Sequence, residues 1–150
     1  ASGPDTPPAV WKYDGSSATL VKNIGESTDT PSDYTVYDGA LYFSVRRTKG
    51  VALYSYDGKS VSQIEVLYSG SRSSISDLTV YRGNLYFSAG TSEKGGIWRY
   101  DGSGISQVQE FRPGTALGDP PSYLTPHDDG LYFAANDGKK GREIWRYEAN

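Results

Sequence analysis

The chain has 150 residues and a formal net charge of −3, with 15 Lys and Arg against 18 Asp and Glu, and it is long enough for one domain with a buried core. It carries no basic stripe of the kind that binds nucleic-acid phosphates, so nucleic acid is not expected as a partner. It has no cysteine and no apolar run long enough to cross a bilayer, so neither cysteine chemistry nor membrane insertion is expected. The 13 Tyr and 18 Gly favour strands joined by tight turns.

The N-terminal residues 1–9 are rich in proline and predict an extended arm. No charged-then-apolar leader precedes them, so the sequence is expected to be mature, with any signal peptide already removed. Residues 10–150 are predicted to contain three copies of one unit of about 45 residues, recognised by internal self-similarity.

Short landmarks define this unit, and they keep the same order and spacing. The string Leu-Tyr-Phe occurs at 41–43, 85–87 and 131–133, and a threonine stands six residues before each of these leucines, at Thr35, Thr79 and Thr125. An aromatic residue followed two places later by Tyr occurs at 11–13, 54–56, 98–100 and 145–147. The first three of these segments run into Asp-Gly, a tight-hairpin signal, and nine residues past each glycine comes a large apolar residue: Ile24, Leu67 and Phe111.

Each landmark indicates one strand of a four-stranded unit. In chain order the sequence predicts the third and fourth strands of a partial unit, then two full units, then the first three strands of a last unit, which makes 13 strands. Their centres are 11–13 and 20–24; then 34–36, 41–43, 54–56 and 62–67; then 78–80, 85–87, 98–100 and 106–111; then 124–125, 131–133 and 145–147.

Four antiparallel strands followed by a longer crossing are typical of a β-propeller blade, so the predicted fold is all-β and propeller-like, with a permuted strand order. Three blades are too few to close a ring, because closed propellers have about four to eight. The open strand edges predict a homo-oligomer. Two arrangements are open: a symmetric dimer that makes six blades, in which the N-terminal fourth strand completes the last blade, and a polymer whose chains join without closing. A third alternative is a segment cut from a longer array.

The segment Gly141-Arg142-Glu143-Ile144-Trp145-Arg146-Tyr147 resembles the core of the bacterial ELWxxDGT repeat, and the resemblance extends over residues 97–147. In the earlier units the motif departs to Ala52-Leu53-Tyr54 and Gly96-Ile97-Trp98. Such repeats are similar to propeller blades and occur in extracellular or surface proteins. The resemblance therefore implies a fold and an extracellular or cell-surface location, and it implies no chemistry.

The candidate ligand-binding residues lie in the loops that leave the second and fourth strands of each unit. These loops share one face of a propeller, and their charged residues differ between units while the strands match, which is typical of functional loops on a fixed scaffold. The candidates are Asp33, Arg46, Arg47, Asp77, Glu93, Lys94, Asp119, Asn136, Asp137 and Lys140.

Other residues have a structural explanation that we prefer. The repeated Trp and Tyr of the third strands could stack on a sugar ring, but their strict repetition favours a core between blades. Asp14, Asp57 and Asp101 could bind a cation, but Asp-Gly is what a hairpin turn requires. Calcium at Asn136-Asp137-Gly138 lacks the spacing of a known calcium loop, and His127 stands where the other units carry a turn tyrosine. No cofactor, metal site or catalytic residue is predicted.

The sequence therefore favours an extracellular, non-enzymatic binding module, lectin-like, that binds carbohydrate or a surface polymer through its loops and gains avidity from several copies. The alternative is a structural or adhesive subunit that polymerises by strand exchange between chains, for which the N-terminal arm could lend a strand. An enzyme on the same scaffold would need a cluster of acids in one cleft, and no particular pair is indicated.

Overall fold

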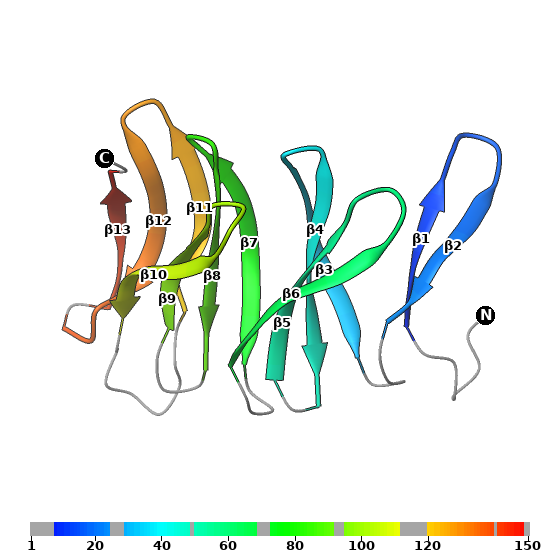
Figure 1. Cartoon of the computed structure of the whole chain (residues 1–150). Coiled ribbons are helices and arrows are strands. Elements are labelled where there is room, and N and C mark those ends of the chain that lie inside the picture. Colours follow the sequence, from blue (N-terminus) through cyan, green and yellow to red (C-terminus); the bar gives the residue numbers. More distant parts are fainter. Residues whose placement is uncertain are drawn as a thin grey trace.

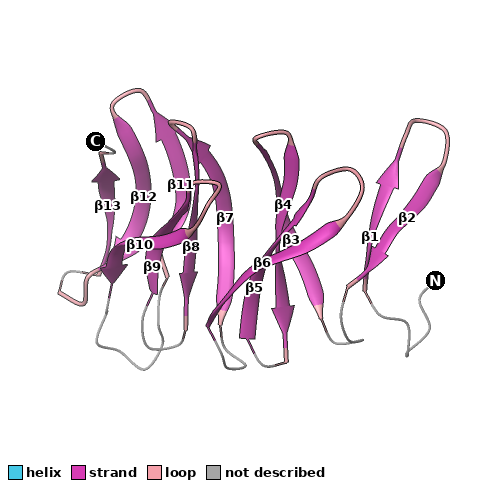
Figure 2. Ribbon diagram, in the orientation of Figure 1, coloured by secondary structure: helices cyan, strands magenta, loops and turns pink. Residues whose placement is uncertain are grey.

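The computed structural model describes residues 8–24, 29–48, 50–68, 73–91, 95–111, 120–139 and 141–148. Within these ranges all regular structure is β-strand (Figure 2). Accordingly, the described residues contain no apolar helix that could cross a membrane. The all-β prediction is confirmed.

The described ranges contain thirteen strands, in the predicted order. They are β1 (Ala9–Tyr13), β2 (Ala18–Asn23), β3 (Thr30–Tyr37), β4 (Ala40–Arg47), β5 (Gly50–Tyr56), β6 (Val61–Tyr68), β7 (Ser74–Tyr81), β8 (Asn84–Gly90), β9 (Gly95–Tyr100), β10 (Ile105–Phe111), β11 (Ser122–His127), β12 (Gly130–Asn136) and β13 (Arg142–Tyr147). Ala9, expected in the arm, thus begins β1, and the carbonyl of Pro8 accepts a hydrogen bond from the Ile24 N–H at 2.7 Å. Residues 1–7 lie outside the described part.

The strands form four antiparallel sheets, β1–β2, β3–β6, β7–β10 and β11–β13. The sheets stand side by side in chain order, with β1–β2 and β11–β13 at opposite ends of the row (Figure 1). The described strands thus form an open row of sheets. The odd-to-even hairpin turns, from β1–β2 through β11–β12, all lie at its upper edge in Figure 1, and the even-numbered strands run from these turns toward the lower edge.

Hairpin turns at the upper edge are fixed by the Asp-Gly pairs. The Oδ1 atom of Asp14 accepts hydrogen bonds from the N–H groups of Ser16 and Ser17, both at 2.9 Å, and Gly15 has a φ of +100°, which a side chain would disfavour. Asp57 and Asp101 make the same bonds in the next two turns. These donors lower the pKa values of Asp14 and Asp101 to about 2.

A bulge recurs in the first strand of each complete or nearly complete sheet. The register shifts between Ser32 and Thr35 in β3, and the same shift follows in β7 and β11. One residue inside each bulge has a left-handed backbone: Asp33 (φ +56°), Asp77 (φ +59°) and Tyr123 (φ +60°). The bulge turns the threonine toward the next sheet, so that the Thr35 hydroxyl donates to the Leu78 carbonyl at 2.8 Å.

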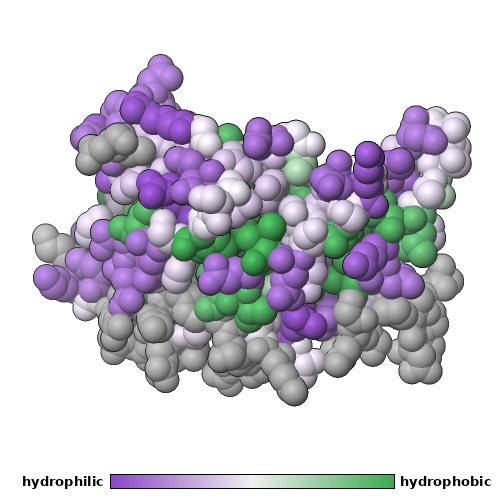
Figure 3. All heavy atoms as spheres, viewed as in Figure 1, coloured by the Kyte–Doolittle hydropathy of each residue, from purple (hydrophilic) through white to green (hydrophobic). Residues whose placement is uncertain are grey.

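Three apolar clusters fill the spaces between consecutive sheets. Val10 and Ile24 pack against Phe43 and Val45 of the next sheet, and two larger clusters follow along the row. The second cluster includes Tyr37, Tyr42, Leu53, Leu85, Phe87 and Tyr100, and the third includes Tyr81, Tyr86, Ile97, Phe111, Leu131 and Phe133. On the face shown in Figure 3, apolar residues are visible mainly across the middle of the row, and hydrophilic residues cover the turns of the upper edge.

Candidate functional site

The candidate loop residues do not converge on one site. Glu93, Lys94, Asp119 and Lys140 lie outside the described residues. The sequence placed the candidates in loops. Among the described ones, however, Asp33, Arg46, Arg47, Asp77 and Asn136 lie within strands β3, β4, β7 and β12, and Asp137 directly follows β12. Two of them, Asp33 and Arg46, line the same cavity. The sequence did not indicate which of the candidates would meet.

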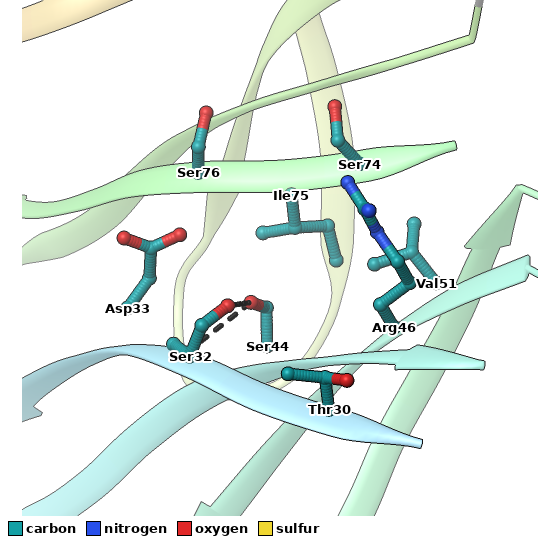
Figure 4. A pocket seen from close by; sticks show the side chains of 9 residues that line it. All are labelled: Thr30, Ser32, Asp33, Ser44, Arg46, Val51, Ser74, Ile75 and Ser76. Atoms are coloured by element: carbon teal, nitrogen blue, oxygen red, sulfur yellow. Dashed lines mark hydrogen bonds between the residues drawn. The ribbon is translucent and has the colours of Figure 1, made fainter. Parts of the chain in front are cut away.

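The cavity lies between the second and third sheets of the row and has a volume of about 250 Å³ (Figure 4). It is lined from β3, β4 and β5 on one side and from β7 on the other, by Thr30, Ser32, Asp33, Ser44, Arg46, Val51, Ser74, Ile75 and Ser76. Five of these residues carry hydroxyl groups. Asp33 and Arg46 stand at opposite ends of the cavity, with Ser32, Ser44 and Ile75 between them (Figure 4).

The hydroxyl groups on the floor of the cavity are partly engaged with one another. The Ser32 and Ser44 Oγ atoms lie 3.0 Å apart, and the Ser44 hydroxyl also reaches the Ser32 carbonyl at 3.2 Å. Each serine hydroxyl is one donor and two acceptor sites, so this pair retains acceptor capacity toward a ligand.

Asp33 is held in its bulge with its carboxylate directed into the cavity (Figure 4). Among the described residues it has no hydrogen-bond or ion-pair partner. Burial raises the pKa of this carboxyl above its usual value, and the charge of Asp77 raises it further. A partly desolvated carboxylate with a free set of lone pairs is an acceptor available to a ligand.

Arg46 supplies the opposite charge. Its side chain is exposed and, within the described residues, makes neither an ion pair nor a hydrogen bond. Its neighbour Arg47 differs, because its Nε lies 3.4 Å from the carboxylate of the buried Asp29 and its guanidinium donates to Gln63 at 3.2 Å. Of these two adjacent candidates, Arg46 thus lines the cavity, and Arg47 makes contacts within the fold.

The remaining described candidates serve the backbone. The Asp77 carboxylate accepts the Tyr123 N–H at 2.8 Å, across to the last sheet. Asn136 and Asp137 each accept the N–H two residues further on, of Gly138 and Lys139, so they form a turn. The described residues contain no cluster of acidic or histidine side chains suited to a metal ion.

His127 lines a second cavity, of about 330 Å³, at the upper edge of the row, together with Val80, Tyr81, Arg82, Pro126 and Asp128. Its Nδ1 lies 2.6 Å from the Asp129 carboxylate, and the pKa of Asp129 is lowered by this contact and by the Tyr132 hydroxyl. Arg82 donates to the Asp128 carbonyl at 2.7 Å. The sequence predicted His127 in the turn, whereas it is the last residue of β11, directly before the turn, and no sequence signal indicated this cavity.

Comparison with known proteins adds nothing to this geometry. No model of a protein family, no curated protein and no solved structure matches the chain. The site has to be interpreted from its own chemistry.

Proposed function

We propose that the chain is an extracellular, non-enzymatic binding module of the propeller type, and that the cavity between β3–β4 and β7 binds a small hydroxyl-rich ligand such as a sugar residue of a glycan. The observation that carries the proposal is a pair of charges, Asp33 and Arg46, neither of which has a partner within the described ranges, at the two ends of a cavity rich in hydroxyl groups. A carboxylate accepts two hydroxyl donors and a guanidinium donates several hydrogen bonds, so both suit a polyol.

The size of the cavity supports a small ligand. Its volume of about 250 Å³ is below the range of roughly 300–1,000 Å³ typical of drug-sized ligands, so it suits one ring with the rest of a polymer outside. Binding at a single small site is weak, and several copies on one assembly would raise the avidity.

The side chains that line the cavity favour binding without catalysis. Glycoside hydrolysis generally uses two carboxyl groups, one on each side of the scissile bond. Among the described residues that line this cavity Asp33 is the single carboxylate, and the nearby Asp77 is bonded to the Tyr123 N–H. The extracellular location rests on the resemblance of residues 97–147 to ELWxxDGT repeats.

Saturation-transfer NMR with a panel of neutral and acidic monosaccharides and short glycans, each at millimolar concentration, tests the proposal. We expect binding by at least one neutral sugar. The Asp33→Asn and Arg46→Ala variants should each weaken it by about tenfold, the loss of one charged hydrogen bond. Because the pKa of Asp33 is raised, binding to the wild-type chain should decline as the pH falls through that pKa, and binding to Asp33→Asn should not follow this course.

The matched control is Arg47→Lys, which keeps the charge beside Asp29 and leaves the cavity lining unchanged. Its affinity should equal that of the wild-type chain. If the whole panel fails to bind, or if a sugar binds equally well to Asp33→Asn and Arg46→Ala, the site is not the one proposed.

A further inference from the structure

The two end faces of the row expose side chains whose equivalents are buried in the interior. In β5 and β9, Leu53 and Ile97 are 0% exposed and lie in the clusters that the following sheet covers. Ile144 of β13 has the same register, because it pairs with Ala134 as Ile97 pairs with Ser88. It is 82% exposed.

The opposite end shows the complementary half of the same contact. The tyrosine that ends each third strand packs against the preceding sheet: Tyr100 lies 5.6 Å from Tyr42 and 6.2 Å from Tyr37, between ring centroids. In β1 the equivalent residue, Tyr13, is 69% exposed, and Trp11 is 62% exposed. Leu20, paired with Trp11, adds to this apolar face, and apolar surface is visible at this end of the row in Figure 3.

The last sheet also retains the aromatic corner that receives such a tyrosine. Inside the row the corner consists of two tyrosines packed edge to face, Tyr37 with Tyr42 at 5.4 Å and Tyr81 with Tyr86 at 5.8 Å. In the last sheet, His127 and Tyr132 occupy these positions, 6.0 Å apart and at an interplanar angle of 88°. The two rings thus lie edge to face as in the interior, and in this corner the Asp129 carboxylate accepts hydrogen bonds from the Tyr132 hydroxyl and from Arg146.

We infer that a second copy of this chain continues the row, with the β1–β2 face of one copy packed on the β11–β13 face of the next. Trp11 and Tyr13 would cover Ile144 and enter the corner of His127 and Tyr132, as the third-strand aromatics of one sheet cover the preceding sheet inside the chain. The internal interfaces are the reason to choose a second copy, because they show which residue types close each face. This association is independent of ligand binding in the cavity.

The contact is heterologous, since the two faces that meet are different, and every copy carries both. Copies would therefore add head to tail into a closed ring or an open chain. This arrangement differs from strand exchange, in which the free edge of β13 would pair with β2 through backbone hydrogen bonds and the exposed faces would contribute little.

Sedimentation velocity on the 150-residue chain over a hundredfold concentration range tests the inference. Wild-type chains should associate, and Ile144→Glu and Trp11→Glu should each weaken the association at least tenfold, because each would bury a charge at the interface. The matched control is Val36→Glu, at a residue that is 68% exposed and belongs to neither end face. It should associate like the wild-type chain, and circular dichroism should show that all three variants are folded.

Mixing the two end-face variants gives the sharper result. Each retains one intact face, so an equimolar mixture of Ile144→Glu and Trp11→Glu should form one-to-one dimers and no larger species. A wild-type chain that stays monomeric throughout overturns the inference. So does association that both variants retain, which would indicate pairing of strand edges, or a mixture that remains monomeric.

Discussion

The interface between β3–β6 and β7–β10 and the interface between β7–β10 and β11–β13 are built from equivalent strands. They differ in the side chains that line them. Between β3–β6 and β7–β10, Arg46 and Asp33 line an open polar cavity. In the interface between β7–β10 and β11–β13, Gly90 is equivalent to Arg46, and Asp77 is equivalent to Asp33. The Asp77 carboxylate accepts a hydrogen bond from the Tyr123 N–H. Equivalent positions of the repeat thus line a cavity in one interface and make a hydrogen bond between sheets in the other.

Prolines close the second interface. Pro120 and Pro121 occupy the positions of Ser74 and Ile75, and they pack on Gly95, where the first interface has Val51. A Cβ atom on Gly95 would lie 2.9 Å from the Pro120 Cα. The glycine therefore lets the prolines approach this closely. Whether the bulge aspartate is available to a ligand therefore depends on whether the next sheet offers it a hydrogen-bond donor, as Tyr123 does for Asp77.

The largest expected effect comes from Gly95→Val, which gives the second interface the residue of the first. Because the nearest obstacle is backbone, we expect the free energy of unfolding to fall by about 2–3 kcal/mol, as measured by urea denaturation. Gly104→Val is the control, since no atom lies within 4 Å of a Cβ built there, and it should change stability much less. Equal effects of the two substitutions would contradict the account of the second interface.

A smaller difference in stability is expected between variants of the two equivalent aspartates, Asp33 and Asp77. Asp77→Ala removes the acceptor of the Tyr123 N–H, whereas Asp33→Ala removes no hydrogen bond made by the described residues, and both replace an aspartate with positive φ. We expect Asp77→Ala to lower the free energy of unfolding by about 1–2 kcal/mol more than Asp33→Ala. Chemical denaturation of both variants in the same buffer measures the difference, and a difference near zero would make the two aspartates structurally equivalent.

The smallest effect has a distinctive pH dependence. The folded-state pKa of Asp33 is raised above the usual 3.8, so the folded chain holds its proton more tightly than the unfolded chain, and stability falls as the pH rises through this window. Asp33→Asn, which keeps a residue that tolerates positive φ, should therefore be more stable than the wild-type chain at neutral pH. The gain should be below about 1 kcal/mol, given the solvent screening, and should vanish below pH 3.8.

Thermal unfolding of both proteins from pH 3 to pH 8 measures this gain. A gain that is the same at every pH would show that the charge of Asp33 is not its cause. Together with the loss of sugar binding expected for the same substitution, a gain confined to higher pH would mean that Asp33 is kept for binding at a cost in stability.

The sequence was sufficient to predict the strands and their order, because the signals are local. Asp-Gly turns and the Leu-Tyr-Phe strings each act within one hairpin. The bulges were not predicted, since neither Asp33 nor Tyr123 carries the glycine signature of a positive φ, although the repeated spacing of Ser32 to Thr35 was a usable sign. The site was predicted in part: Asp33 and Arg46 were named, but Ser74 and Ser76 reach the cavity only through packing of separate sheets.

The arrangement of sheets in a row has a consequence for how the chain unfolds. Each sheet is held by its own hairpins and by the sheets beside it, so local stability is expected to depend on position, as in repeat proteins. The β3–β6 and β7–β10 sheets are each covered on both faces by apolar clusters, whereas β1–β2 is covered on one. Amide hydrogen exchange should therefore be slowest in the central strands of these two sheets, β4, β5, β8 and β9, and fastest in β1 and β2.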